Sequence, residues 1–321
     1  MNYFLLKLAF KGPIHFGGGD SAMSLQHSED HFCGDTLFSA LCHAALQREG
    51  EEGLHQLVSM AQEGAFLLSD GMPWYGAQLY LPKPMMTGNG RREIPAEQRK
   101  TVKKLAWIPV LEMEMFCESL CGGEPYNAAA ESFGIQLERT AAKLTYGEDA
   151  LPYQVGLYQF RENCGLYVIL ATEREEQAQW ITLLMERLGL SGIGGKTSAG
   201  YGRFEIVESI KLNASPDDQT RWIYHALQRK DGRQLLLTTS LPKDAELEQT
   251  VDDAYYQLVR RGGFVASDTY AETARKKRTQ YFLAAGAVLT CRFQGDVYDV
   301  GQGAGHPVYR YGKPLLLGVD L

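Results

Sequence analysis

The sequence of 321 residues contains no run of about 18 apolar residues, the length that an α-helix needs to cross a bilayer. Its first residues, MNYFLLKLAFKGPIHF, alternate apolar with polar side chains as a strand does. They show neither the basic start nor the small-residue cleavage site of a secretory signal. We therefore expect a cytoplasmic protein that has no membrane segment.

Cysteine is sparse and irregularly spaced, at positions 33, 42, 117, 121, 164 and 291. In a chain of this length such spacing indicates reduced thiols, and we expect no disulfides. His31, Cys33, Cys42 and His43 invite a zinc interpretation. Their spacing is not that of a known zinc finger, and two neighbouring residues on one helix point about 100° apart. We expect neither a metal nor another cofactor.

Positive charge is in the minority, because the formal net charge is −7. This balance argues against a protein that coats nucleic acid with its whole surface. Lys and Arg nevertheless gather in two basic islands, residues 88–107 and residues 275–278. The pattern is compatible with an RNA groove on one face, although each island alone could be a solvated helix face or loop.

The order of expected elements predicts an α+β fold. Residues 1–211 read as strand, helix, strand pair, helix and strand, which is the ferredoxin-like (RRM-like) βαββαβ order. A long insertion at about 85–150 interrupts this pattern. A polar stretch at 212–220 marks a boundary, and residues 212–321 read as a second, shorter round of the same fold. We therefore predict two ferredoxin-like domains.

Four details of this pattern can be tested in the structure. Asp35 is predicted to be the N-cap of a first helix that closes at Gly50. Residues 156–172 are predicted to form a hairpin, and residues 244–261 are predicted to form a helix. A helix over residues 174–189 is predicted to turn four side chains inward: Trp180, Leu183, Leu184 and Leu188.

A glycine-rich loop, SGIGGKTSAGYGRF at residues 191–204, is the segment best suited to an anion. It is not a nucleotide-binding P-loop, because Leu190 stands where the first glycine is required and a helix precedes the loop. A dinucleotide fingerprint fails for the same reason of order. Glycines let the main chain approach a ligand and present successive N–H groups to phosphate. The loop could thus clamp single-stranded RNA, with a plain flexible turn as the alternative.

Several stretches resemble a known family. The segment GIGGKTSAGYGRF after a helix is similar to the signature of the RAMP superfamily of CRISPR proteins. HFCGDTLFSAL, FLLSDGMPW, RGGFVASD and the C-terminal GDVYDVGQGAGHPVYRYGKPLLLGV resemble the fourth subunit of the type III-A Csm effector complex. The resemblance covers most of the chain. It implies a noncatalytic subunit that holds the 5′ handle of the CRISPR RNA (crRNA), docks on the large palm-domain subunit and starts the filament of backbone RAMP subunits.

The resemblance also implies which residues contact the handle. They lie after the first strand, at the start of the first helix, in the segment ERTAAKLTYGEDALPYQVGLY and in the glycine loop. Carried over residue by residue, they are His15, Gly17, Gly18, Asp35, Ser39, Arg139, Thr140, Thr145, Gly194, Gly195, Lys196, Thr197, Ser198, Gly200, Tyr201 and Arg203. In the loop, Lys196 and Arg203 could add charge and Tyr201 could offer a ring to a base.

Two other functions stay open at the level of sequence. A repeat-specific endoribonuclease of the same superfamily would use a histidine as general base, but none of the seven histidines stands in a recognisable acid–base pairing. A carboxylate such as Asp35 could serve metal-assisted hydrolysis, although an N-cap role is simpler. A module that binds only proteins would leave the glycine loop structural. We expect no catalytic residue.

Overall fold

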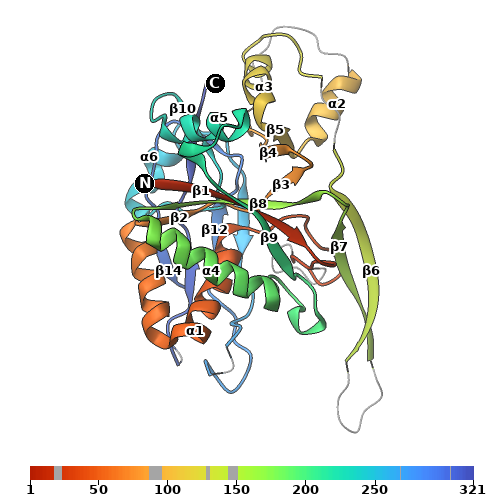
Figure 1. The fold of residues 1–321 in the computed structure, drawn as a ribbon, viewed down its shortest axis with the longest axis vertical. Helices are drawn as coiled ribbons and strands as arrows, with labels where there is room; N and C mark the ends of the chain where they lie inside the picture. Colours follow the sequence, from red (N-terminus) through yellow and green to blue (C-terminus); the bar gives the residue numbers. More distant parts are fainter. Residues whose placement is uncertain (18–23, 87–95, 128–130, 144–150, 268, 304) are drawn as a thin grey trace.

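The computed structural model describes residues 1–17, 24–86, 96–127, 131–143, 151–267, 269–303 and 305–321. Within these residues the protein has a mixed α+β fold with antiparallel sheets, so the predicted class is confirmed (Figure 1). In this part of the chain no helix is long and apolar enough to span a membrane. The α-helices are α1 (Gly34–Glu63), α2 (Ala96–Lys104), α3 (Met113–Leu120), α4 (Glu175–Ser191), α5 (Asp218–Gln228) and α6 (Asp244–Val251), and the 3-10 helices are η1 (Val110–Glu112), η2 (Thr197–Ala199) and η3 (Leu212–Ala214).

The largest sheet has the strand order β5-β4-β3-β8-β1-β9, and β2 also pairs with β8. Its strands are β1 (Asn2–Phe10), β2 (Phe66–Leu68), β3 (Met72–Tyr75), β4 (Gln78–Pro82), β5 (Trp107–Pro109), β8 (Cys164–Thr172) and β9 (Phe204–Lys211). Every residue of β8 is buried, which explains its nearly continuous apolar sequence. The centre of the sheet therefore carries a core on both faces.

Alternate side chains of the central strands enter these two cores. Leu6 and Leu8 of β1 pack with α1 and α4 on one face. Leu5 of β1 packs with α3 and α5 on the other face. Figure 1 shows α1 and α4 side by side, in keeping with their direct packing.

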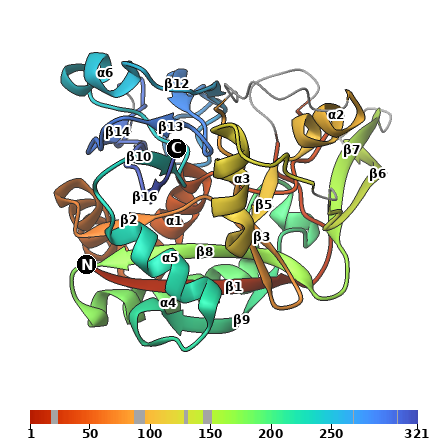
Figure 2. The same cartoon turned by 90° about the horizontal axis from the view of Figure 1, so that it is seen from above.

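The C-terminal residues add smaller antiparallel units. A three-stranded sheet has the order β13-β10-β16, and two ribbons pair β11 with β12 and β14 with β15. These strands are β10 (Arg233–Leu236), β11 (Leu258–Arg261), β12 (Gln280–Leu283), β13 (Val288–Leu289), β14 (Val297–Asp299), β15 (Tyr309–Tyr311) and β16 (Leu316–Val319). Figure 2 shows the blue C-terminal strands gathered on one side of β1 and β8. Buried hydrogen bonds tie the C-terminal units to β2: the Leu68 N–H donates to the Tyr311 hydroxyl, and Thr238 Oγ1 donates to Leu68 O.

A long ribbon of β6 (Gly134–Lys143) and β7 (Leu151–Phe160) projects from the body of the molecule (Figure 1). The hairpin predicted over residues 156–172 is therefore wrong. Its two strands exist, but β7 pairs with β6 while β8 pairs with β1. The almost entirely apolar β8 gains most by lying at the centre of the large sheet, whereas the first half of β7 is largely exposed on the projecting ribbon.

Two predicted helices differ from the structure. The first does break at Gly50, where φ is +69°, but a second helical segment continues from there to Glu63. The helix predicted over residues 244–261 ends at Val251, and Asp253 adopts a left-handed φ of +48°. Residues 258–261 instead form β11, because pairing with β12 overrides their helical pattern.

The inward face of α4 was predicted correctly except at one position. Leu184 and Leu188 are buried, and Trp180 packs partly buried against the same core. Leu183 is exposed instead, and Ile181 lies in the core where Leu183 was expected. The 3.6-residue period of the helix places Ile181 between its buried neighbours three and four residues away.

Candidate nucleic-acid interface

A groove of about 1240 Å³ brings together segments that lie far apart in the sequence. One wall, here called the N-terminal wall, contains residues 15–17, the start of α1 and Gly194–Gly195. The other, the C-terminal wall, contains residues 257–264, Lys277 and Arg310. Of the residues predicted to bind RNA, the groove lining includes His15, Gly17, Asp35, Ser39, Gly194 and Gly195.

The N-terminal wall is built on close packing between His15 and two glycines. The Gly195 N–H donates to His15 O at 2.8 Å, and a Cβ atom at Gly195 would lie 2.6 Å from His15 Cδ2. Gly194 has a φ of +97°, and a Cβ there would lie 2.7 Å from His15 O. A side chain at Gly194 would therefore displace the backbone, and one at Gly195 would displace the His15 ring. The loop thus needs its glycines for packing at this point.

The imidazole of His15 has a defined orientation. Nδ1 lies 2.7 Å from the carbonyl oxygen of Gly156, so it carries the proton in the neutral ring. Nε2 is then the unprotonated nitrogen, and the ring lines the groove. A buried histidine held this way can accept a hydrogen bond from a ligand.

The glycine loop does not present its N–H groups as expected. Those of Gly192, Gly195, Gly200 and Gly202 all donate to backbone carbonyls of the protein. The prediction that these glycines offer N–H groups to phosphate is therefore wrong for these four positions. Of these four, Gly195 is the one in the groove lining, where the lack of a side chain lets a ligand approach the backbone.

Several predicted residues lie outside the groove lining. They are Lys196, Thr197, Ser198, Gly200, Tyr201 and Arg203 of the loop, and Arg139 and Thr140 of β6. The Lys196 ammonium lies 3.0 Å from the Tyr153 hydroxyl and 4.8 Å from the centre of that ring. Thr140 exchanges hydrogen bonds with Gln154 on the exposed ribbon. Gly18 and Thr145 lie outside the described residues.

The helix start at α1 corrects the predicted role of Asp35. The N-cap position is Cys33, and Asp35 lies in the first turn of the helix. The Gly34 N–H donates instead to Asp70 Oδ1 at 2.6 Å, and Asp70 also accepts hydrogen bonds from Thr239. Burial raises the pKa of Asp70, although these hydrogen bonds oppose the shift. A carboxylate brought in from the loop before β3 thus caps the helix.

Asp35 joins the two walls of the groove through a buried ion pair. It accepts hydrogen bonds from Arg261 Nε at 3.0 Å and Nη2 at 2.6 Å, and Arg310 Nε lies 3.8 Å away. Burial disfavours the charge on Arg261, but the Asp35 carboxylate more than offsets this and raises the pKa of the guanidinium. The Arg261 guanidinium therefore stays charged, and its ion pair with Asp35 holds α1 against β11.

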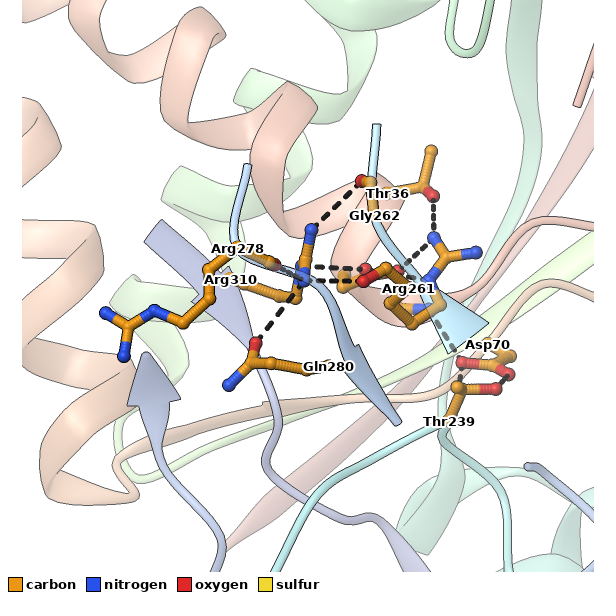
Figure 3. A network of polar contacts seen from close by, with 10 residues as sticks. Thr36, Asp70, Thr239, Arg261, Gly262, Arg278, Gln280 and Arg310 are labelled. Carbon is orange, nitrogen blue, oxygen red and sulfur yellow. Dashed lines mark hydrogen bonds and ion pairs between the residues drawn. The ribbon is translucent and has the colours of Figure 1, made fainter. Parts of the chain in front are cut away.

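Arg310 organises the C-terminal wall. Its guanidinium donates to the carbonyl oxygens of Arg261, Gly262 and Arg278 and to the side chain of Gln280 (Figure 3). The side chain is only 4% exposed. Buried guanidinium groups satisfied in this way fix the segments they contact. Arg310 thus locks residues 261–262 and residues 278–280 against one another.

Lys277 supplies a cation to the groove. Burial and the nearby Arg310 lower its pKa, and its ammonium makes no hydrogen bond or ion pair with any residue in the described ranges. A partly buried charge without a partner is unfavourable unless a ligand of opposite charge compensates it. The site prediction missed Lys277, although the second basic island contains it.

His31, which also lines the groove, pairs with the neighbouring carboxylate of Asp30. His31 Nδ1 lies 2.8 Å from Asp30 Oδ1. Burial lowers the pKa of His31, but the hydrogen bond and charge of Asp30 outweigh it and leave that pKa raised. The sequence analysis recognised no acid–base pair among the histidines, although Asp30 and His31 are adjacent in the chain. In the described part of the chain, no three His, Cys, Asp or Glu side chains gather as a metal site.

Comparisons with known proteins place these features in context. A family model described as "CRISPR Csm4 C-terminal domain" matches residues 229–319. A Mycobacterium tuberculosis (strain CDC 1551 / Oshkosh) protein named "CRISPR system Cms protein Csm4" is 35% identical over 321 residues, which cover 99% of this chain and 98% of the relative. A Streptococcus thermophilus protein of the same name is 29% identical over 330 residues and covers 100% of both chains.

Two solved structures share the fold. One, titled "Crystal structure of Csm3-Csm4 subcomplex in the type III-A CRISPR-Cas interference complex", gives a TM-score of 0.65 at 19% identity, with 100% of both chains covered. The other, "Crystal structure of Csm1-Csm4 cassette in complex with cA4", gives 0.62 at 21% identity and covers 100% of this chain and 99% of that one. At these identities the likeness establishes the fold.

Proposed function

Since the chain belongs to the Csm4 family of type III-A CRISPR proteins, we propose that it is a noncatalytic RNA-binding subunit of the effector complex that holds the crRNA 5′ handle in the groove. The observation that carries this proposal is the pairing of the two walls. Glycines and His15 let a backbone approach closely on one side, and on the other the Lys277 ammonium has no hydrogen-bond or ion-pair partner among the described residues. Single-stranded RNA needs such a combination of shape and positive charge.

The proposed protein partners are the large palm-domain subunit and the backbone RAMP subunit. The support is the pair of solved structures with the same fold, whose titles join Csm4 to Csm1 in one case and to Csm3 in the other. The chain carries exposed apolar side chains outside the groove lining, among them Leu190 and Leu111, that protein contacts could cover. Pull-down of the purified chain with each partner, singly and together, tests both contacts.

We also propose that residues 1–211 and 212–321 are two ferredoxin-like units. In support of the first, the strands β3-β8-β1-β9 follow the spatial order of a βαββαβ sheet, with α1 and α4 on one face. The second unit would comprise the C-terminal strands with α5 and α6.

An endoribonuclease is the second candidate, favoured by the two histidines in the groove. His15 has Nε2 free to accept a proton, and the raised pKa of His31 suits a proton donor. A denaturing gel of the binding reactions separates the candidates, because only the endoribonuclease shortens the RNA.

The proposal predicts that Lys277→Ala weakens binding of an RNA that carries a repeat-derived 5′ handle by about tenfold, the usual effect of losing one charged hydrogen bond. The slope of log affinity against log salt should flatten by about one unit. The measurement is a fluorescence anisotropy titration with handle and scrambled RNAs, with and without the large subunit, in EDTA. The matched control is Lys230→Ala, an exposed lysine outside the groove lining.

Preferential binding of intact handle RNA by the wild type, weakened by Lys277→Ala and unchanged by Lys230→Ala, supports the proposal. Equal affinity for handle and scrambled RNA under every condition would contradict it. Shortened RNA that depends on His15 or His31 would favour the endoribonuclease instead.

A further inference from the structure

A large aromatic side chain stands exposed in the C-terminal wall. Phe264 is 55% exposed and lines the groove. It sits on a short ribbon, because Phe264 bridges Lys276 and the Lys277 N–H donates to Gly263 O at 2.8 Å. Tyr281 is exposed to a similar degree, 57%, but is not part of the groove lining. Phe264 therefore differs from other exposed rings in facing a concave, basic surface.

The surroundings of the ring combine positive charge with open space. The Lys276 ammonium lies 5.8 Å from the centre of the Phe264 ring, and Lys277 lies in the groove beside the same ribbon. Gly263 has a φ of +95°, and a Cβ atom there would meet nothing within 4 Å. A flat ligand could thus cover the ring without a clash with the preceding turn.

Hydrogen bonds from Arg310 and an ion pair of Arg261 hold this ribbon in place. Arg310 donates to Gly262 O at 3.0 Å and to Arg278 O at 2.9 Å, which joins the two strands of the ribbon at one end. Arg261 at the start of the ribbon is fixed by its ion pair with Asp35. A ring on so well-anchored a segment loses little conformational entropy when a ligand stacks on it.

We propose that Phe264 is a stacking platform for one unpaired nucleobase of single-stranded RNA, with Lys276 and Lys277 binding the phosphates that flank that nucleotide. The proposal rests on the proposed function, since it assumes that the groove holds RNA. Base stacking on an aromatic ring between basic side chains is the usual arrangement for single strands, and it tolerates any base because every base has a π-face. The basic surroundings favour RNA over an apolar segment of a protein.

A cycle of abasic RNAs and ring variants tests the platform. Handle RNAs that each lack one base are titrated against the wild type, Phe264→Ala, Phe264→Trp and the control Tyr281→Ala. For the wild type, loss of one particular base should weaken binding on the order of tenfold. Phe264→Ala should weaken binding of intact RNA to a similar degree and remove the penalty at that position alone. Phe264→Trp should restore the penalty, and Tyr281→Ala should leave it unchanged.

Other outcomes overturn the inference. Equal abasic penalties for the wild type and Phe264→Ala at every position mean that no base stacks on this ring. A loss that appears only when the large subunit is present assigns Phe264 to a protein contact. Wild-type protein that shows no preference for the handle refutes the proposed function and the platform together. An effect of Lys277→Ala without one of Phe264→Ala refutes the platform only.

Discussion

The two walls of the groove offer different properties to a ligand. On the N-terminal wall the polar groups bond one another, as His15 does with Gly156 and Gly195, and the glycines provide close approach. On the C-terminal wall Arg310 satisfies the backbone, while Lys277 and Phe264 are left to face the groove. The N-terminal wall thus supplies the shape of the groove, and the C-terminal wall supplies its positive charge. Affinity should depend on the C-terminal wall, and fit on the N-terminal wall.

The largest effect on stability should come from removing the Asp35–Arg261 ion pair, which links the two walls. Asp35→Ala leaves Arg261 buried without its carboxylate, and loss of one partner of a buried ion pair typically costs about 3–5 kcal/mol. We expect the free energy of unfolding to fall by about 3 kcal/mol. Urea denaturation, followed by far-ultraviolet circular dichroism, measures this change.

The matched control for Asp35 is Asp320→Ala. Asp320 also forms a two-pronged ion pair, with Arg229, but its side chain is 71% exposed. Exposed pairs contribute about 0–1 kcal/mol, so this variant should stay close to the wild type. Equal losses for the two variants would mean that the buried pair does not hold the walls together.

The next effect concerns the fit of the N-terminal wall. Gly194→Ala and Gly200→Ala both place a side chain at positive φ, +97° and +85°, which costs about 1–2 kcal/mol in each case. At Gly194 the new Cβ also meets His15 O, whereas at Gly200 it meets nothing within 4 Å. We expect Gly194→Ala to be the less stable by about 1 kcal/mol or more, as for other overpacked sites.

Thermal unfolding of the two variants side by side measures this difference, and Gly200→Ala is the control for backbone strain. Handle RNA titrations on the folded fraction should show a weaker complex for Gly194→Ala only. If both variants lose the same stability and the same affinity, the close packing of His15 on the loop has no role in the groove.

The sequence allowed the prediction of elements whose pattern is local. Alternation in residues 2–10 and the helical period in residues 174–189 predicted β1 and α4, and the glycine content of residues 191–204 marked the loop. Contacts between segments that are distant in the sequence could not be predicted from these local patterns. Asp35 and Arg261 lie 226 residues apart, and nothing local distinguishes this ion pair from a cap.

The same limit explains what the site prediction missed. The segment 275–278 was noted as basic, but charge alone does not say which lysine turns into a groove. That depends on the ribbon with Gly263 and on the Arg310 hydrogen bonds beneath it. The loop cations Lys196 and Arg203 were favoured because they are near in sequence to the glycines, yet neither lines the groove.

The smallest effect concerns the Asp30–His31 pair, whose histidine lines the groove. The pKa of Asp30 is lowered, so its share of the stability is present above its unfolded pKa and is lost as the pH falls. The pKa of His31 is raised, so its share is present below its unfolded pKa and is lost as the pH rises through the folded value. The pair should therefore stabilise most at about pH 5–6.

His31→Gln should then lower the free energy of unfolding more at pH 5.5 than at pH 8.5. The difference should be about 1 kcal/mol or less, because both side chains are roughly one-third exposed, 32% and 34%. Urea denaturation at the two pH values measures it, with His55→Gln on the exposed side of α1 as the control. A His31→Gln effect that is equal at both pH values would show that the charges of Asp30 and His31 do not stabilise the fold.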